Sequence, residues 1–414
     1  MARAGLFSLS AQALAWRVTS MAAVTLGAVV TGRQLGPAGR GVVILVLTLS
    51  AVGVALGSGG IHFSGRLLLV SPTDRIRPGG YVGLALGLAA SLGLASALAG
   101  VAVLPAAHVQ VGPALAAAVG AVAASSLLQL LLVEQLQAFG FSSRAAGVDA
   151  LSSIVQLILV AAVAGAGVAT AAPFLCAVAI SNGFGTLAAL GSLRRQGVEV
   201  RPRYRPEEWR RLLGGGRPGL AVGLAELLMF RLDRYIVAVV LLPSAVGIYG
   251  VAATAPEMLR LPVAAVAQPV FYRLAAGAAS LEDFRRTRQV VLAATAAGVV
   301  VMAALAPLVV EVAFGPAYRT AVTPLRILLL SEFGVALFYL DGSALAGLGR
   351  TRESAWAAGV GLAVTTLGDL LFIPVYGLAG AAWASVVGYS VMGGITHICA
   401  RRRPRAALSN AAPP

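Results

Sequence analysis

Long apolar stretches alternate with short polar segments along the 414-residue chain. A helix that crosses a ~30 Å hydrocarbon core needs about 20 apolar residues, and clusters of arginine, glycine or proline recur here at about that interval. The pattern predicts an all-α polytopic membrane protein with about twelve transmembrane helices, at residues 6–31, 41–65, 79–105, 112–139, 145–168, 171–193, 216–242, 245–272, 288–313, 321–347, 354–374 and 377–400.

The arginines give this topology a direction. All 31 basic residues are arginine, and 23 of them fall in segments that the predicted spans place on one side of the membrane. Only 4 are assigned to the opposite side, with Arg33 and Arg40 in one loop and Arg319 and Arg326 in or near another, and 4 fall inside the spans. Because arginine-rich segments stay in the cytoplasm, the pattern is typical of an inner (plasma) membrane protein with both termini in the cytoplasm.

The longest polar stretch divides the chain into two halves of six helices. We expect residues 194–215 to be a basic cytoplasmic linker between six-helix bundles at 1–193 and 216–400, followed by a disordered basic tail at 401–414. Within the linker, residues 207–213 combine acids, a tryptophan and leucines in a pattern that predicts a short helix at the membrane surface.

A weak internal repeat supports this division. Segment 35–42, after the first helix, and segment 242–251, after the seventh, combine leucine, proline, glycine and valine at corresponding places. Parallel repeats commonly flank a transport pathway, so the two bundles are expected to surround a central lumen. The glycines within residues 57–60 are expected to bend the second helix or to open its backbone toward the lumen.

The composition is typical of a membrane protein, and it argues against a soluble domain and against a nucleic-acid-binding protein. With 58% hydrophobic and 11% charged residues and a mean hydropathy of +0.88, the chain is far more apolar than a soluble domain, in which roughly 25% of residues are charged. The net charge of +15 comes from arginines spread over many short loops, so no nucleic-acid partner is expected. The 49 glycines fit helices that pack closely without a hydrophobic driving force between them.

No residues are arranged for catalysis or for metal binding. His62, His108 and His397 are scattered along the chain, and Cys176 and Cys399 form no metal-binding pattern. We therefore expect neither an enzyme nor a cofactor nor a metal site.

The chemistry that the sequence does offer lies in ionisable residues inside the spans. An arginine or a carboxylate costs ~2.5–3.5 kcal/mol at the centre of a membrane helix, so such residues usually face a cavity or a partner. Two interpretations stay open: a water-filled cavity that binds an anion, or ion pairs that join helices, such as Glu257 with Arg260 at i, i+3. These residues include Arg17, Glu226, Arg231, Asp233, Arg234, Glu257, Arg260, Glu332, Asp341 and Asp369.

The arginines and the acids inside the spans are suited to different roles, the arginines to binding an anion and the acids to carrying a coupling ion. A guanidinium binds phosphate through two parallel hydrogen bonds. The candidate residues for binding an anionic head group are therefore Arg17, Arg231, Arg234 and Arg260. The candidates for carrying a coupling proton or sodium ion are Glu226, Asp233, Glu257 and Asp341.

Five groups of residues, spread over nearly the whole chain, carry a family resemblance. They are residues 33–41, residues 232–236 with 246–249, residues 314–318, residues 349–350 and residues 373–382. In this order they resemble the Wzx-like polysaccharide flippases of the multidrug/oligosaccharidyl-lipid/polysaccharide (MOP) exporter superfamily. Asp233 and Arg234 match the pair on helix 7 of that family, whereas Arg17 and Arg260 are only inferred to line its lumen.

The resemblance implies two six-helix bundles around a lumen that opens alternately to either side, as in MATE and other MOP proteins. It implies a flippase that moves a polyprenyl-diphosphate-linked oligosaccharide from the cytoplasmic to the outer leaflet. The implied partners are this lipid-linked oligosaccharide, membrane lipids, and the polymerase and glycosyltransferases of polysaccharide synthesis. The alternatives are a MATE-like drug/cation antiporter and a non-transporting scaffold of a polysaccharide assembly complex.

Overall fold

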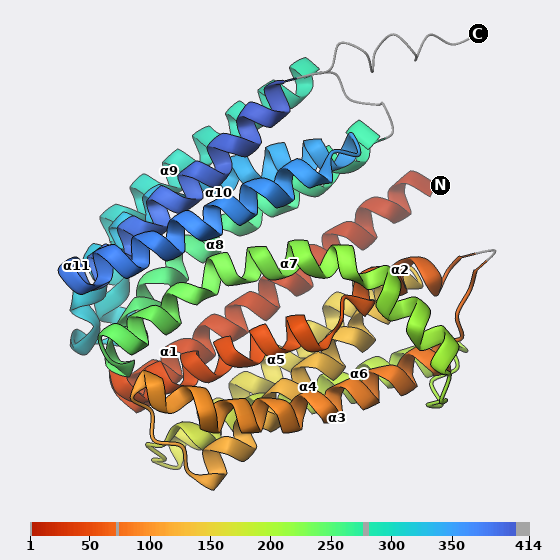
Figure 1. Ribbon diagram of the computed structural model, residues 1–414, viewed down its shortest axis with the longest axis horizontal. Helices are drawn as coiled ribbons and strands as arrows, with labels where there is room; N and C mark the ends of the chain where they lie inside the picture. Colours follow the sequence, from red (N-terminus) through yellow and green to blue (C-terminus); the bar gives the residue numbers. More distant parts are fainter. Residues whose placement is uncertain (1, 72–73, 276–280, 403–414) are drawn as a thin grey trace. The chain divides into compact units, whose positions relative to one another are not determined.

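The computed structural model describes residues 2–71, 74–275 and 281–402, which fold into helices and turns with no strand among them (Figure 1). The all-α fold predicted from the apolar pattern is confirmed. The tail from residue 403 onward, for which disorder is expected, lies outside the described residues. The elements are α1 (Ala2–Gly57), α2 (Ile61–Leu68), α3 (Pro78–Val103), η1 (Leu104–Ala107), α4 (Pro113–Ala138), α5 (Ser142–Gly165), α6 (Ala171–Arg195), α7 (Pro206–Val240), α8 (Pro243–Ala275), α9 (Leu281–Phe314), η2 (Pro316–Ala321), α10 (Val322–Gly347) and α11 (Thr351–Arg401).

Two glycines divide α1 and α11 into two arms each. Gly36 (φ 63°) and Gly377 (φ 58°) adopt a left-handed backbone conformation that residues with a side chain rarely adopt. The two arms of each helix run in opposite directions (Figure 1), and in α1 Arg40 Nη1 donates across them to the carbonyl of Ala28 at 2.5 Å. With these breaks, and with α2 continuing the second arm of α1, the helices account for the predicted spans.

The second span is broken at its glycines, as predicted. The second arm of α1 ends at Gly57, and α2 begins at Ile61 after a turn through Gly59 (φ 54°) and Gly60 (φ 74°). The hydroxyl of Ser64 in α2 then donates to the carbonyl of residue 212 in α7 at 2.7 Å. The break therefore sets α2 against the start of α7.

Residues 207–213, expected to form a separate short helix, are the first turns of α7. Trp209 donates from its indole nitrogen to the carbonyl of Gly80 at the start of α3 (2.9 Å), and Arg211 forms an ion pair with Asp74. The prediction of a separate surface helix is wrong because these contacts hold the residues as the beginning of one 35-residue helix.

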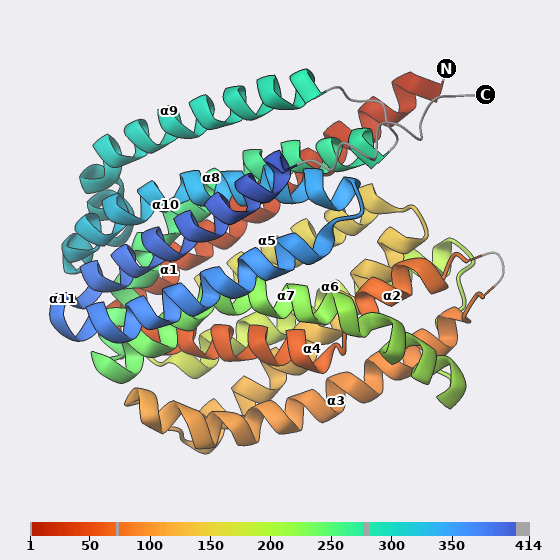
Figure 2. The same ribbon diagram turned by 45° about the horizontal axis from the view of Figure 1, so that its top comes forward.

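The chain divides into two compact units. The first contains Met1–Leu227 with Leu242–Gly247, and the second contains Leu228–Leu241 with Ile248–Pro414. Within the first unit, α1 packs against α5, and α4 contacts both α3 and α6. Within the second, α10 contacts both α9 and α11 (Figure 2). Each unit thus has its own set of packed helices, while the domain limits drawn from the polar linker stay a prediction.

Within each unit, neighbouring helices approach each other closely at small residues. This is expected in a membrane, where no hydrophobic force drives helices together. Between α3 and α4, a β-carbon added to Gly120 would lie 2.6 Å from the carbonyl oxygen of Gly93. Between α10 and the second arm of α11, one added to Gly334 would lie 2.6 Å from the carbonyl carbon of Tyr389. The abundant glycine of the sequence is therefore used where two backbones touch.

The two segments that resemble each other in sequence, around the break of α1 and at the start of α8, touch reciprocally at residues of the first unit. A β-carbon added to Gly41 would lie 2.6 Å from the carbonyl carbon of Pro243, and one added to Gly247 would lie 2.8 Å from the carbonyl carbon of Pro37. Contacts that are repeated in both directions are typical of two related segments around a local two-fold axis. Both positions require glycine because no other residue fits this approach.

Replacing Gly247 by alanine should destabilise the protein by about 1–3 kcal/mol, because the added methyl group overlaps the backbone of Pro37. The measurement is the midpoint of thermal unfolding of the purified protein in detergent. Gly27→Ala in α1 is the matched control, since a β-carbon at that position meets no atom within 4 Å. Equal midpoints for the two variants would contradict the contact.

Candidate functional site

The charged residues inside the bundle helices concentrate on α7 and α8. Eight helices of the described chain are long and apolar enough to cross a membrane by length and composition alone, and these two are not among them. The second half of α7 carries Arg231, Asp233 and Arg234, while α8 carries Glu257 and Arg260 together with three internal prolines. A proline cannot donate the helical hydrogen bond to the residue four positions earlier, so α8 lacks part of its backbone bonding beside these charges.

The charges form a network within the second unit, which we call the charged cluster (Arg231, Asp233, Arg234, Glu257, Arg260 and Glu332). Glu257 Oε1 accepts a hydrogen bond from Arg234 Nη2 at 2.7 Å and lies 3.4 Å from Arg231 Nη1. One carboxylate therefore serves two guanidinium groups. The side chains of Arg231 and Glu257 are 33% and 36% exposed, which makes this part of the cluster accessible.

Arg260 has a different partner from the one that its spacing on α8 predicts. It binds Glu332 of α10 instead of Glu257, with Nη2 at 2.9 Å and Nε at 3.1 Å from Oε1 of that carboxylate. The guanidinium also lies 4.5 Å from the ring centre of Phe230, a cation–π contact. The Glu332 side chain is only 2% exposed, so this ion pair is buried and joins α8 to α10.

Two buried acids of the second unit lie close enough for their charges to interact. Asp233 accepts a hydrogen bond from the backbone nitrogen of Arg234 (2.8 Å), and Tyr249 lines the same small cavity as Asp233. Asp369, in the first arm of α11, is 1% exposed, and neither of its carboxylate oxygens has a hydrogen-bond partner within the described ranges. An ionised carboxylate is costly to bury without a partner, so this pair of acids is suited to hold a proton or a cation.

The sequence identified Asp369 as a charge inside a span but not as a coupling residue. A signal was present, since it is the one acid within the predicted span 354–374. The proximity of Asp233, from a helix more than a hundred residues earlier, could not be seen in that span. The structure therefore adds Asp369 to the candidate coupling residues.

A cavity of 10 Å³, about the volume that one water molecule requires, lies beside the charged cluster. It offers room for a single water or ion and not for a sugar. Its lining consists of charged, aromatic and aliphatic residues of the second unit: Phe230, Asp233, Arg234, Tyr249, Ala253, Pro256, Glu257, Arg260, Leu328 and Tyr389.

The structure brings together five of the eight predicted site residues and places the other three elsewhere. Asp341 of α10 belongs to an ion-pair network of its own, with Arg288 of α9 at 3.1 Å and His397 of α11 at 2.7 Å. Glu226 is half-buried on α7, and Arg17 is exposed on the first arm of α1, both in the first unit. The residues of the prediction that meet in the charged cluster are Arg231, Asp233, Arg234, Glu257 and Arg260.

Arg17 differs from the arginines of the charged cluster. It is exposed, and within the described part of the chain it forms neither a hydrogen bond nor an ion pair, although the charge of Asp149 on α5 interacts with it. The arm that carries Arg17 packs on α5, where the hydroxyls of Ser20 and Ser153 are 2.8 Å apart. An exposed guanidinium on a membrane helix needs water or an anion nearby, because hydrocarbon cannot solvate it.

Replacing Glu332 by glutamine should destabilise the protein by about 3–5 kcal/mol, because Arg260 is then buried without its countercharge. Thermal unfolding in detergent measures the effect. Glu311→Gln is the matched control, since the pair of Glu311 with Arg319 is exposed and such pairs contribute about 0–1 kcal/mol. A loss no larger than that of the control would show that the buried pair is dispensable.

No protein-family model matches this chain, and no curated protein matches it. Solved structures do match in fold. An inward-facing multidrug resistance MATE family transporter of the MOP superfamily matches with a TM-score of 0.78 at 15% identity, over 95% of this chain and 96% of that chain. Lipid II flippase MurJ, in an inward closed conformation, matches with a TM-score of 0.74 at 12% identity, over 96% of this chain and 88% of that chain.

A third match is a MOP superfamily transporter from Pyrococcus furiosus, described as having a binding pocket of reverse polarity that suggests a different function. Its TM-score is 0.63 at 16% identity, over 95% of this chain and 94% of that chain. Several proteins of different described function thus share one arrangement of helices with this chain. The protein is a multi-pass membrane protein with the fold of MOP superfamily transporters.

Proposed function

We propose that the protein is a flippase for a polyprenyl-diphosphate-linked oligosaccharide, working by alternating access in the inner membrane of a prokaryote. It moves the substrate from the cytoplasmic to the outer leaflet for cell-surface polysaccharide synthesis, with both of its termini in the cytoplasm. Glycosyltransferases that build the substrate and a polymerase that consumes it are its proposed partners.

The main support for this proposal is the exposed and unpaired side chain of Arg17 in the described structure. It is an exposed cation and the one charged residue of the predicted span 6–31, with no ion pair among the residues that the structure describes. A guanidinium in that position costs ~2.5–3.5 kcal/mol unless water or an anion reaches it. A diphosphate is the anion expected in a lipid-linked sugar, and arginine binds phosphate oxygens through two parallel hydrogen bonds.

The accessible part of the charged cluster supports the same chemistry. Arg231 and Arg234 share the single carboxylate of Glu257, so a diphosphate can replace this carboxylate on one guanidinium without leaving the other unpaired. Arg260, which is fixed between Glu332 and the ring of Phe230, presents a rigid charge beside them. The fold likeness to a lipid II flippase fits a lipid-linked substrate.

A MATE-like drug/cation antiporter is the second candidate, and Asp369 is the observation that favours it. A buried carboxylate without a hydrogen-bond partner, beside Asp233, is what an exchanger of organic cations for protons or sodium ions needs. The fold likeness to a multidrug resistance transporter fits this role equally well. In a flippase the same two acids couple transport to an ion gradient.

Purified protein in liposomes separates the two candidates. One set of vesicles receives a fluorescent polyprenyl-diphosphate oligosaccharide, and a second set receives a fluorescent organic cation. The proposal expects movement of the lipid-linked sugar between leaflets and no accumulation of the cation. The reverse result would establish the antiporter, and transport of neither, by correctly folded protein, would favour a scaffold.

A further inference from the structure

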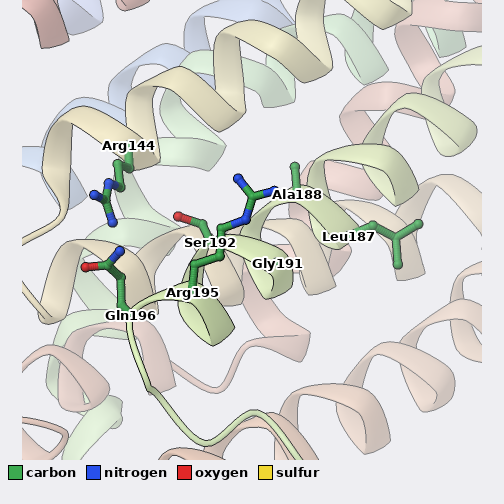
Figure 3. A pocket seen from close by; sticks show the side chains of 7 residues that line it. All are labelled: Arg144, Leu187, Ala188, Gly191, Ser192, Arg195 and Gln196. Carbon is green, nitrogen blue, oxygen red and sulfur yellow. The ribbon is translucent and has the colours of Figure 1, made fainter.

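A cavity of 570 Å³ lies in the first unit between the start of α5 and the end of α6. Figure 3 shows Arg144 from α5 and Arg195 and Gln196 from the end of α6 around the same space. None of the candidate transport residues lines it. The lining consists of Arg144, Leu187, Ala188, Gly191, Ser192, Arg195 and Gln196.

No acid in the part of the chain that the structure describes pairs with the arginines of this cavity. Within the described ranges, Arg144 and Arg195 form neither a hydrogen bond nor an ion pair, and no acid is among the lining residues. The guanidinium of Arg144 lies 5.4 Å from the ring centre of Phe141, which holds it at the edge of the cavity. Two guanidinium groups, the hydroxyl of Ser192 and the amide of Gln196 are hydrogen-bond donors suited to the oxygens of a phosphate group.

Exposed apolar side chains lead from the cavity along both helices. On α6 they lie eight, eleven and fifteen residues before Arg195, and on α5 they lie seven and fourteen residues after Arg144, so each set shares a face with its arginine. Such a face is suited to the acyl chains of a lipid whose head group occupies the cavity. The residues are Ile180, Phe184 and Leu187 on α6 and Leu151 and Ile158 on α5.

We propose that this cavity binds the phosphate of an anionic phospholipid, whose acyl chains lie along α5 and α6. A basic pocket between membrane helices, next to apolar surface, is typical of sites for anionic lipid head groups. A free phosphate ion makes no use of the apolar faces, which is why the phospholipid is the expected occupant. The lipid is bound here and not transported, so the site is separate from the proposed transport pathway.

Equilibrium binding of fluorescent phosphatidylglycerol to the purified full-length protein tests the proposal, with phosphatidylcholine as the zwitterionic comparison. The wild type should prefer phosphatidylglycerol by on the order of tenfold, as expected for two arginines near the head group. R144Q/R195Q should lose this preference. R194Q/R210Q removes two arginines that are exposed nearby on the chain but do not line the cavity, and it should keep the preference.

A second variant blocks the cavity without changing charge. A β-carbon at Gly191 meets no atom within 4 Å, so Gly191→Phe should fold and should exclude the head group. Equal preference for phosphatidylglycerol in the two double variants, or unchanged binding by Gly191→Phe, would overturn the proposal. Displacement of the lipid by an equal concentration of soluble glycerol 3-phosphate would also overturn it, by showing that free phosphate is the ligand.

Discussion

Replacing Arg17 by alanine should reduce translocation of a diphosphate-linked lipid at least about tenfold while the protein remains folded in the membrane. The expected size follows from the loss of a hydrogen bond between charged groups, which contributes about 1.5–3 kcal/mol. Stability should change little, because this side chain forms no ion pair or hydrogen bond within the described residues. The measurement is the initial rate of lipid movement between leaflets in proteoliposomes of equal protein content.

Two further variants give this prediction its controls. Arg17→Lys keeps the charge but binds phosphate only as a point charge, so it should retain part of the rate. Arg210→Ala removes an exposed arginine near the start of α7 and should leave the rate unchanged. A normal rate for Arg17→Ala would remove Arg17 from the mechanism.

Replacing Asp369 by asparagine should abolish the response of transport to an ion gradient without destabilising the protein. The carboxylate is buried, has no hydrogen-bond partner in the described structure, and interacts with the charge of Asp233. A neutral amide of the same shape removes the cost of burying this charge, but it has no proton to exchange and no negative charge to attract a cation. The measurement is the transport rate with an imposed proton or sodium gradient, divided by the rate without one.

The control for Asp369 is Glu353→Gln, another acid of α11. Glu353 lies in the first turn of that helix and pairs with Arg350, so its neutralisation should leave the response to the gradient intact. If the ion gradient increases the transport rate of Asp369→Asn by the same factor as that of the wild type, Asp369 is a structural residue and other residues couple transport to the gradient.

The sequence alone predicts the features that depend on residues close together in the chain, namely the spans and the breaks at glycines. The spans follow from the length of each apolar stretch, and the turn before α2 follows from glycines that tolerate a left-handed backbone. The break of α1 at Gly36 likewise falls between two predicted spans. These features are fixed by residues that are neighbours in the chain.

The features that the sequence did not predict depend on contacts between distant segments. Spacing on α8 pairs Arg260 with Glu257, but the nearer carboxylate in the folded protein is Glu332, which lies 72 residues away. The start of α7 was predicted as a separate helix because its contacts with α2 and α3 cannot be read from its own sequence. Spacing restricts only the partners on the same helix, so ion pairs between helices need the structure.

The network around Asp341 is a further case of this kind. The sequence marked Asp341 as a coupling candidate and treated His397 as isolated, whereas the two side chains are 2.7 Å apart and both contact Arg288. An acid that pairs with an arginine is already neutralised by the protein. Asp369, which has no such partner in the described residues, is therefore the stronger candidate for exchange of an ion.

The most direct test of the flippase proposal is a leaflet-resolved measurement on wild-type protein in liposomes. It compares a fluorescent oligosaccharide linked to a polyprenyl diphosphate with the same oligosaccharide on a neutral polyprenyl lipid. We expect the diphosphate lipid to move between leaflets much faster than in protein-free vesicles, and the neutral lipid to move no faster. Movement of both lipids at equal rates, or of neither, would contradict the claim that arginines of this protein recognise the diphosphate.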